Sequence, residues 1–216
     1  MRTSFLSPTL LATLVFTGPL LSAQGASTPD CVTIATPKPA AVYTFQYVQS
    51  SGTPTQTTQQ WESVTPTGSR ARITGPAGIQ IQVNEHHIVN DAMVLDRTAK
   101  ENANGGVIDA TSFKPGLVGD PAFRACAGGQ WAIPSVTATY RSSQANASVQ
   151  TPAGTLRIIG IRERVTVPAG TFDTVHYIRT SQSVDEYWKS TLHGVIVRHI
   201  AKAGGVTITE TLQSIK

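Results

Sequence analysis

The stretch TPAGTLRIIGIRERVTVPAGTFDTV, residues 151–175, decides the fold class because it holds one four-residue motif twice. Pro152-Ala153-Gly154-Thr155 recurs as Pro168-Ala169-Gly170-Thr171. Proline presets the φ angle of a turn and glycine accepts conformations that other residues avoid. Each copy is therefore predicted to form a tight hairpin turn, with a single strand running between the two.

Alternating apolar and polar residues extend this pattern in both directions. Tyr43, Phe45 and Tyr47 fall on one side of a predicted strand, and Gly204-Gly205 predicts the last hairpin. Further strands are predicted over 57–64, 70–74, 79–83, 172–179, 185–189, 194–200 and 206–212. Short strands separated by turn residues indicate an all-β antiparallel meander, forming a curved sheet, an open half-barrel or a barrel.

Two regions in the middle of the chain are less regular. Residues 85–104 fit either two strands, over 87–89 and 93–97, or a short helix over 91–100. Residues 102–130 are rich in glycine, proline and asparagine, and we expect a long irregular loop there. Long loops in compact domains often carry function, so this segment is a candidate site.

The first 26 residues have the composition of a secretory signal peptide. Arg2 precedes an apolar run from Leu10 to Leu21, and small residues follow. A transmembrane anchor is the alternative, but Gly18-Pro19 interrupts a run that is already short for a bilayer. We therefore expect a signal peptide over 1–26, a single β domain over 27–216, and a periplasmic or secreted protein without a membrane span.

Cys31 and Cys126 are the two cysteines of the chain. Oxidising compartments favour disulfides, so export predicts a Cys31–Cys126 bond that closes a loop of about 95 residues. The chain has no C-x-x-C motif, so the spacing of the cysteines gives no indication of a redox role.

The passage from Val165 to Val175, then Tyr187-Trp188, then His193-Gly194-Val195-Ile196-Val197-Arg198, resembles a family of exported bacterial domains of unknown function. Members carry a V-x-V-P-A-G-[ST]-[FY] hairpin, a Tyr-Trp strand and a Gly-[VL]-V-x-[KR] strand. The resemblance covers the C-terminal third and implies a curved antiparallel sheet in the cell envelope. It implies no catalytic residues, and residues 189–193 replace the Ala-Pro-Gly turn usual in that family.

Charge and motifs exclude several classes of function. Charged residues make up 14% of the chain, and the net charge of +4 comes from scattered single residues. We expect no nucleic-acid partner, because such proteins gather Lys and Arg on one face. Neither a phosphate-binding G-x-x-x-x-G-K-[ST] loop nor a G-x-G-x-x-G loop occurs, and no cofactor is predicted.

Aromatic side chains are the main candidates for a binding site. They could line an apolar groove on the concave face of a curved sheet, or simply form the core. The set is Tyr43, Phe45, Tyr47, Trp61, Trp131, Tyr140, Phe172, Tyr177 and Trp188. We select Tyr43, Phe45, Tyr47, Trp61, Trp131 and Trp188 as candidate ligand-binding residues.

His86 and His87 are candidate metal ligands, because Glu85 and Asp91 lie close to them in the sequence. On a regular strand, however, the two imidazoles would point to opposite faces.

Two hypotheses about function remain. The first is a non-enzymatic exported protein that binds an apolar molecule or a component of the cell envelope. The second is an exported hydrolase with a histidine-assisted nucleophile, although no G-x-S-x-G elbow is present. The second hypothesis requires one histidine within hydrogen-bond reach of both a serine and an acid.

Overall fold

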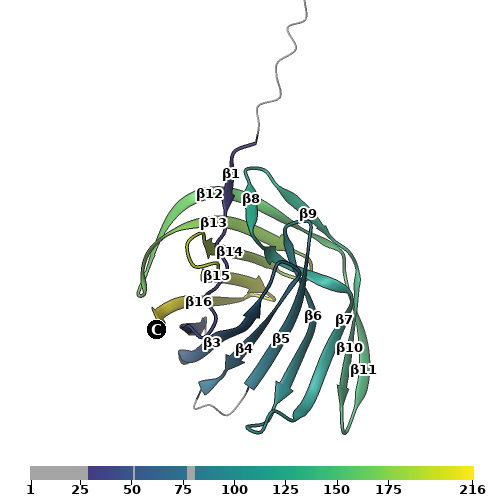
Figure 1. Cartoon of the computed structure of the whole chain (residues 1–216). Coiled ribbons are helices and arrows are strands. Elements are labelled where there is room, and N and C mark those ends of the chain that lie inside the picture. Colours follow the sequence, from purple (N-terminus) through teal and green to yellow (C-terminus); the bar gives the residue numbers. More distant parts are fainter. Residues whose placement is uncertain (1–28, 51, 77–80) are drawn as a thin grey trace, which may run out of the picture.

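A computed structural model describes residues 29–50, 52–76 and 81–216 (Figure 1), and this part of the chain is almost entirely β. Its strands are β1 (Cys31–Thr33), β2 (Val42–Gln49), β3 (Thr55–Val64), β4 (Gly68–Thr74), β5 (Ile81–Val89), β6 (Ala92–Glu101), β7 (Val107–Pro121), β8 (Arg124–Cys126), β9 (Gln130–Ile133), β10 (Val136–Ser142), β11 (Asn146–Thr151), β12 (Gly154–Val167), β13 (Gly170–Thr180), β14 (Val184–Ser190), β15 (Ile196–Ala203) and β16 (Val206–Ile215). All of their pairings are antiparallel, which confirms the predicted fold class.

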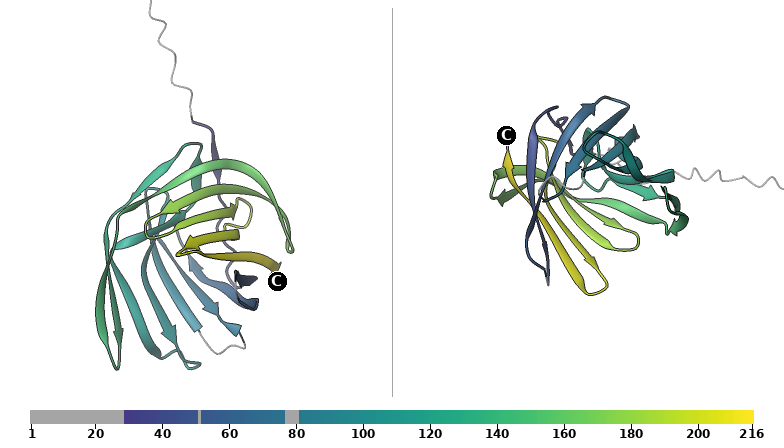
Figure 2. Two further views of the ribbon diagram at one scale, coloured as in Figure 1. Left: turned by 180° about the vertical axis from the view of Figure 1, so that it is seen from behind. Right: turned by 90° about the horizontal axis from the view of Figure 1, so that it is seen from below.

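One curved sheet holds 14 of these strands, in the order β11-β10-β7-β6-β5-β4-β3-β2-β16-β15-β14-β13-β12-β9. β2 divides it into an N-terminal arm, β3–β7 with β10 and β11, and a C-terminal arm, β12–β16 with β9. Figures 1 and 2 show the C-terminal arm arching over the N-terminal arm. The two arms therefore face each other across the concave side of the sheet.

The chain crosses from one arm to the other within 122–135. β9 pairs with β12 at the edge of the C-terminal arm, and β10 then returns to pair with β7 in the N-terminal arm. β1 pairs with β8 at this crossing, and the predicted Cys31–Cys126 disulfide is confirmed there, with 3.9 Å between the two Cα atoms. The disulfide thus fastens the N-terminal strand to the segment that joins the arms.

The expectation of a long irregular loop over 102–130 is wrong, because β7, β8 and β9 occupy most of it. The turn residues have two other roles. The segment 102–106 forms the turn between β6 and β7, where the backbone N–H of Asn102 donates to the carbonyl oxygen of Gly106. Pro115-Gly116 lies within β7 at a shift in its register with β6, between the pairs Leu95–Leu117 and Arg97–Ser112. Such bulges accept glycine and proline inside a strand.

The first Pro-Ala-Gly-Thr copy is not a hairpin, which corrects the prediction made from the repeat. β11 pairs only with β10, whereas β12 pairs with β9 and β13, so Pro152-Ala153 links strands that lie near opposite ends of the sheet. Gly154 instead allows a close backbone approach, since a Cβ atom there would lie 1.7 Å from the carbonyl oxygen of Thr180. The second copy does form a hairpin, in which Val167 pairs with Gly170.

Residues 85–104 adopt the two-strand alternative, as parts of β5 and β6, and the helix over 91–100 is wrong. Asn90 and Asp91 form the turn between them with φ angles of 50° and 58°. Asparagine and aspartate tolerate this left-handed conformation better than most residues. The Gly204-Gly205 hairpin is confirmed, with φ angles of 56° and 80°.

Buried side chains form two clusters, one toward β9 and β12 and the other around β2. The first includes Val118, Leu156 and Tyr177, and the second includes Tyr43, Phe45 and Leu212. The predicted signal peptide over 1–26 lies outside the described residues. None of the described residues forms a helix with the length and apolar character needed to cross a membrane.

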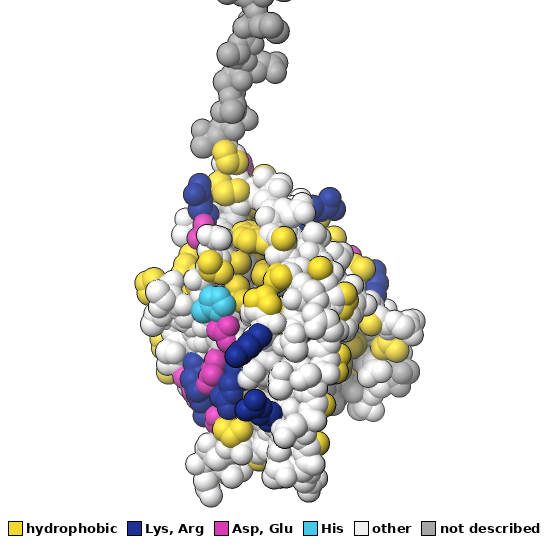
Figure 3. Space-filling view, turned by 90° about the vertical axis from the view of Figure 1, so that its right-hand side faces the viewer, with side chains coloured by type: hydrophobic (Ala, Val, Ile, Leu, Met, Phe, Trp, Pro, Cys, Tyr) yellow, Lys and Arg dark blue, Asp and Glu magenta, His cyan; other side chains and the backbone are white. Residues whose placement is uncertain are grey.

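The surface of β3–β6 that faces away from the concave side of the sheet carries charged side chains of both signs. Arg70 and Arg72 bind Glu62 on β3 and the buried Glu101 on β6, at distances of 2.5–3.1 Å. Figure 3 shows acidic and basic side chains interleaved on this side of the molecule. Because the charges neutralise one another, this face is not a basic patch.

Candidate ligand-binding pocket

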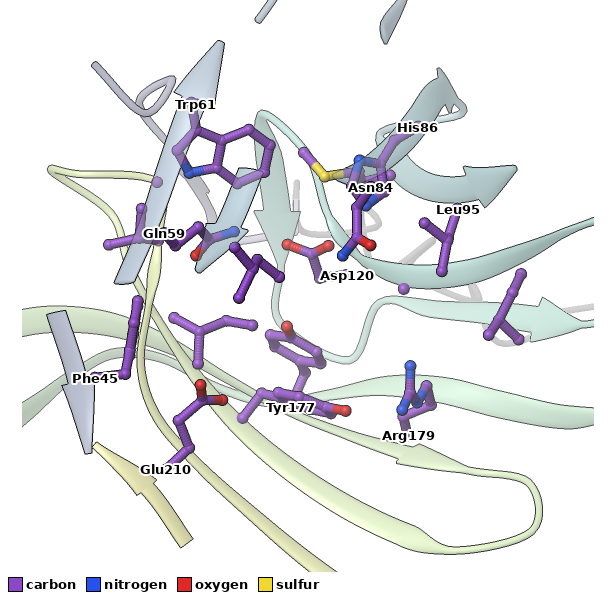
Figure 4. A pocket seen from close by; sticks show the side chains of 18 residues that line it. Phe45, Gln59, Trp61, Asn84, His86, Leu95, Asp120, Tyr177, Arg179 and Glu210 are labelled. Atoms are coloured by element: carbon purple, nitrogen blue, oxygen red, sulfur yellow. The ribbon is translucent and has the colours of Figure 1, made fainter. Parts of the chain in front are cut away.

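A pocket of about 250 Å³ lies on the concave side, between the two arms (Figure 4). The N-terminal arm contributes side chains from β3–β7, and the C-terminal arm contributes side chains from β13–β16 and from the turn before β15. The apolar lining residues include Phe45, Trp61, Ile73, Met93, Leu95, Leu117, Tyr177, Tyr187 and Ile196. A mostly apolar cavity with a few polar groups is the usual form of a small-molecule site.

Stacked rings form the wall contributed by the C-terminal arm. Tyr177, Tyr187 and His199 are cross-strand neighbours on β13, β14 and β15, so their side chains share one face of the sheet. The two tyrosine rings stack with centroids 5.0 Å apart, and Tyr187 stacks on His199 at 4.2 Å. This packing holds the tyrosines in fixed positions against the pocket.

A buried ion pair joins the arms beside the pocket. Lys189 of β14 is 2% exposed, and its ammonium group binds the carboxylate of Asp120 on β7 and the carbonyl oxygen of Pro121. Asp120 lines the pocket, and Figure 4 shows it between Trp61 and Tyr177. The pair therefore places a neutralised carboxylate in the middle of the site.

A second charged cluster lies at the side of the same wall. Arg179 donates a 3.0 Å hydrogen bond to Asp185, and its guanidinium group lies 5.4 Å from the Tyr187 ring centre. His199 lies between Asp185 at 3.7 Å and Glu210 at 3.6 Å. Burial alone would raise the pKa of Asp185, but the nearby imidazole of His199, the charge of Arg179 and hydrogen bonds from Ser183 and Arg179 lower it to about 2.

Among the described residues that line the pocket, two polar atoms that are shut off from solvent have no hydrogen-bond partner. They are the indole N–H of Trp61, a residue 6% exposed, and the hydroxyl of Tyr177, which is fully buried. Burial raises the pKa of Tyr177 well above its usual value, so the hydroxyl keeps its proton. Unpartnered buried donors are rare in folded proteins because each costs free energy.

Ser69 and His86 meet at the N-terminal arm, 3.3 Å apart between Oγ and Nδ1. Burial lowers the pKa of His86, and the charge of Lys189 acts in the same direction against that of Asp120, so the imidazole is neutral at pH 7. Within the described part of the chain, no carboxylate forms a hydrogen bond or an ion pair with His86. The pair thus lacks the acid that would orient a catalytic histidine.

The two histidines predicted as metal ligands point to opposite faces. His86 lines the pocket, while His87 binds Asp96 at 2.8 Å on the other side of the sheet. Among residues 29–50, 52–76 and 81–216, no group of three or more histidine, cysteine and acidic side chains is arranged to hold a metal ion.

The structure places the six selected aromatic residues in different surroundings. Phe45 and Trp61 line the pocket, and Tyr43 is fully buried in the same core cluster as these two residues. Tyr47 lies further along the same face of β2, where it pairs with Glu210. Trp131 and Trp188 lie outside the pocket.

Both of these outlying tryptophans have partners of their own. The indole N–H of Trp131 donates a 2.8 Å hydrogen bond to the carbonyl oxygen of Asn90. Trp188 stacks on His176, donates to Glu163 and lies under Arg198, on the face opposite Tyr187.

Several pocket residues were missed by sequence reasoning, namely Tyr187, Asp120, Arg179 and Glu210. Only Tyr187 had a usable signal in the sequence, because it is an aromatic residue next to Trp188 in the predicted strand over 185–189. In the structure it pairs with Tyr177 of β13.

The chain matches no protein-family model, and searches against curated proteins and solved structures return no match.

Proposed function

We propose that this protein is exported and binds a small, largely apolar molecule in the pocket between the two arms. The observation that carries the proposal is the pocket itself, which is lined by rigidly stacked aromatic rings and aliphatic side chains from both arms. An apolar cavity of about 150 Å³ accommodates benzene. The pocket of about 250 Å³ therefore fits a molecule somewhat larger than benzene.

Export is supported by the Cys31–Cys126 bond, since structural disulfides persist mainly in oxidising compartments. The signal-peptide composition and the resemblance to exported envelope domains support the same inference. A component of the cell envelope that carries an apolar group of the size of this pocket would also be a suitable ligand.

Binding of a small fluorescent apolar dye, 1-naphthylamine, to the purified protein tests the proposal. Leu95→Trp would fill the pocket with a larger side chain, and we expect dye affinity to fall by about tenfold or more. Leu192→Trp is the matched control, because Leu192 is 74% exposed. Equal affinities of the two variants would refute a site in this pocket.

Native mass spectrometry of the protein purified from its periplasmic or secreted fraction gives an independent test. We expect a co-purified small apolar molecule that is absent from Leu95→Trp. A ligand that is retained equally by both proteins would place the binding surface elsewhere.

The Ser69–His86 pair favours hydrolysis as a second candidate function. Nucleophilic catalysis needs a serine whose histidine is itself oriented, and His86 has no such partner in the described structure. Ser69→Ala would abolish turnover of an ester substrate if the pair were catalytic, and would leave dye binding intact.

A further inference from the structure

Strand β11 forms an open edge at one end of the 14-stranded sheet. It pairs with β10 over all six residues from Asn146 to Thr151, and no other strand of the described residues pairs with it. Figure 1 shows β11 at the outer margin of the N-terminal arm. A strand offers hydrogen-bonding groups on both of its sides, so the outer side of β11 presents backbone N–H and C=O groups that face no partner strand.

The opposite end of the sheet is covered. β9 has only four residues, and beside it the backbone N–H of Ile158 on β12 donates to the carbonyl oxygen of Gly129. Further along β12, Arg162 has a φ angle of 60° at a shift in register and binds Asp30 of the N-terminal segment at 2.5 Å. Bulges, charged residues and covering segments of this kind prevent the edges of sheets from pairing with other chains.

β11 has none of these protective features. Its pairing with β10 contains no bulge, and residues 142–151 include neither a charged residue nor a proline. Residues 143–150 are all exposed. Side-chain hydrogen bonds nevertheless fix the strand in place, since Ser148 bonds Thr139 at 3.2 Å and Gln150 accepts from Thr137 at 3.0 Å. The open edge is therefore regular, uncharged and ordered.

One face of β11 continues the concave face of the sheet. Cross-strand pairs lead to it along that face, in the order Thr98 of β6, Thr111 of β7, Tyr140 of β10 and Ala147 of β11. The first of them donates a hydrogen bond to Asn84, which lines the pocket. Val149 lies two positions beyond Ala147 and thus on the same face, where it is 63% exposed.

We propose that β11 pairs with β11 of a second copy of this chain, antiparallel and about a twofold axis, so that two sheets join into one. The proposal goes beyond the function proposed above, because no described residue of β11 lines the pocket.

The composition of the edge favours a second copy as the partner. A twofold axis places each side chain of β11 near the same few side chains of the other β11, and like charges at such positions repel. Residues 142–151 contain no charge that could oppose this self-pairing. Val149 lies in the middle of the strand, where it would pack against apolar side chains of the other copy. The joined strands would satisfy the open backbone groups of both copies.

Sedimentation velocity of the mature protein, with its disulfide intact, tests the proposal. A single pair of six-residue strands forms a small interface, so we expect a dimer with a dissociation constant of about 10–100 µM. The mass should rise from monomer to dimer between about 1 and 300 µM protein. It should not rise further, because a twofold interface closes on itself. A monomer at every concentration, or growth beyond a dimer, would overturn the proposal.

Val149→Lys places two like charges close together at the joined edge. We expect the dissociation constant to increase by about tenfold or more. Val184→Lys is the matched control, because Val184 is 46% exposed on β14, a strand that is paired on both sides. This control adds the same charge and should dimerise like the wild type. Urea unfolding should show both variants folded, and an equal dissociation constant for the two would place the interface elsewhere and refute the proposal.

Hydrogen exchange followed by mass spectrometry locates the contact. Amides within 146–151 should exchange more slowly in the wild-type protein at about 300 µM than at about 1 µM, because pairing protects the outward-facing N–H groups. The exposed turn over 102–106 between β6 and β7 should exchange equally at both concentrations. Dimerisation without added protection in 146–151 would show that β11 is not the interface.

Discussion

The ammonium group of Lys189 in β14 is buried against the carboxylate of Asp120 in β7, and it also donates a 2.7 Å hydrogen bond to the carbonyl oxygen of Pro121. β7 and β14 belong to different arms of the sheet and are far apart in its strand order. The ion pair therefore ties the arms together across the concave side, beside the pocket.

Removing the ammonium group should destabilise the protein strongly. Lys189→Met would leave the Asp120 carboxylate without its counter-ion in a largely buried position, which costs about 3–5 kcal/mol of unfolding free energy. Urea denaturation followed by circular dichroism measures this loss. Lys202→Met, at an exposed position of β15, is the control and should change stability by less than about 0.5 kcal/mol.

The double variant Lys189→Met/Asp120→Leu distinguishes a buried charge from a packing defect. With both charges gone, much of the lost stability should return. If the double variant is as unstable as Lys189→Met alone, the unpaired carboxylate is not the cause.

The disulfide should contribute strongly to stability, because Cys31 and Cys126 are 95 residues apart in the chain. Replacing both with alanine is expected to cost about 2–5 kcal/mol. Urea unfolding of the wild-type protein with and without reductant should show the same difference, and the double alanine variant should not respond to reductant. An unchanged wild-type midpoint under reductant would contradict this prediction.

The sequence predicted strands wherever the pattern was local. Tyr43 and Phe45 alternate with polar residues, and the Val167–Gly170 hairpin needs contacts only between neighbours in the chain. The hairpin predicted from the first Pro-Ala-Gly-Thr copy was wrong because there the glycine is required by a contact with a residue distant in the sequence. At Gly154 the glycine admits the backbone of Thr180, a contact that the local pattern does not encode.

The pocket was predicted only in part for the same reason. Alternation identified Phe45 and Trp61 as residues of a buried face, and both line the pocket. Asp120 and Arg179 join them only because the two arms curve toward each other, which no local spacing reports. Trp188 differs from Tyr187 by a single position, and in a strand this places it on the opposite face.

Gly194 should be intolerant of substitution. Its φ angle is 65°, and a Cβ atom would lie 2.0 Å from the carbonyl oxygen of Ala35. Gly194→Ala would therefore combine left-handed strain of about 1–2 kcal/mol with a backbone clash, and we expect a loss of more than about 2 kcal/mol. Urea unfolding checks the loss.

Gly204→Ala separates the two causes, because its φ angle is 56° and no atom lies within 4 Å of the added Cβ. We expect this control to lose only the strain of about 1–2 kcal/mol. Equal losses for both variants would exclude the clash with Ala35 as a cause.

His199 should make stability depend on pH. Burial disfavours its charged form, but the two nearby carboxylates of Asp185 and Glu210 outweigh burial and raise its pKa above 6.5 in the folded protein. A raised folded pKa gives a stabilisation that is complete below the unfolded pKa and disappears as pH rises through the folded value. The wild-type protein should therefore exceed His199→Gln in unfolding free energy by more at pH 5.5 than at pH 8.5, as measured by urea denaturation.

The control for this pH effect is His87→Gln, because His87 is about half exposed beside Asp96 on the other face. Surface pairs of this kind contribute little, so the difference between wild type and His87→Gln should be small at both pH values. Asp185 cannot produce the trend in this range, since its pKa of about 2 keeps it ionised throughout. A gap between wild type and His199→Gln that widens with rising pH would mean that burial, rather than the two carboxylates, governs the charge of His199.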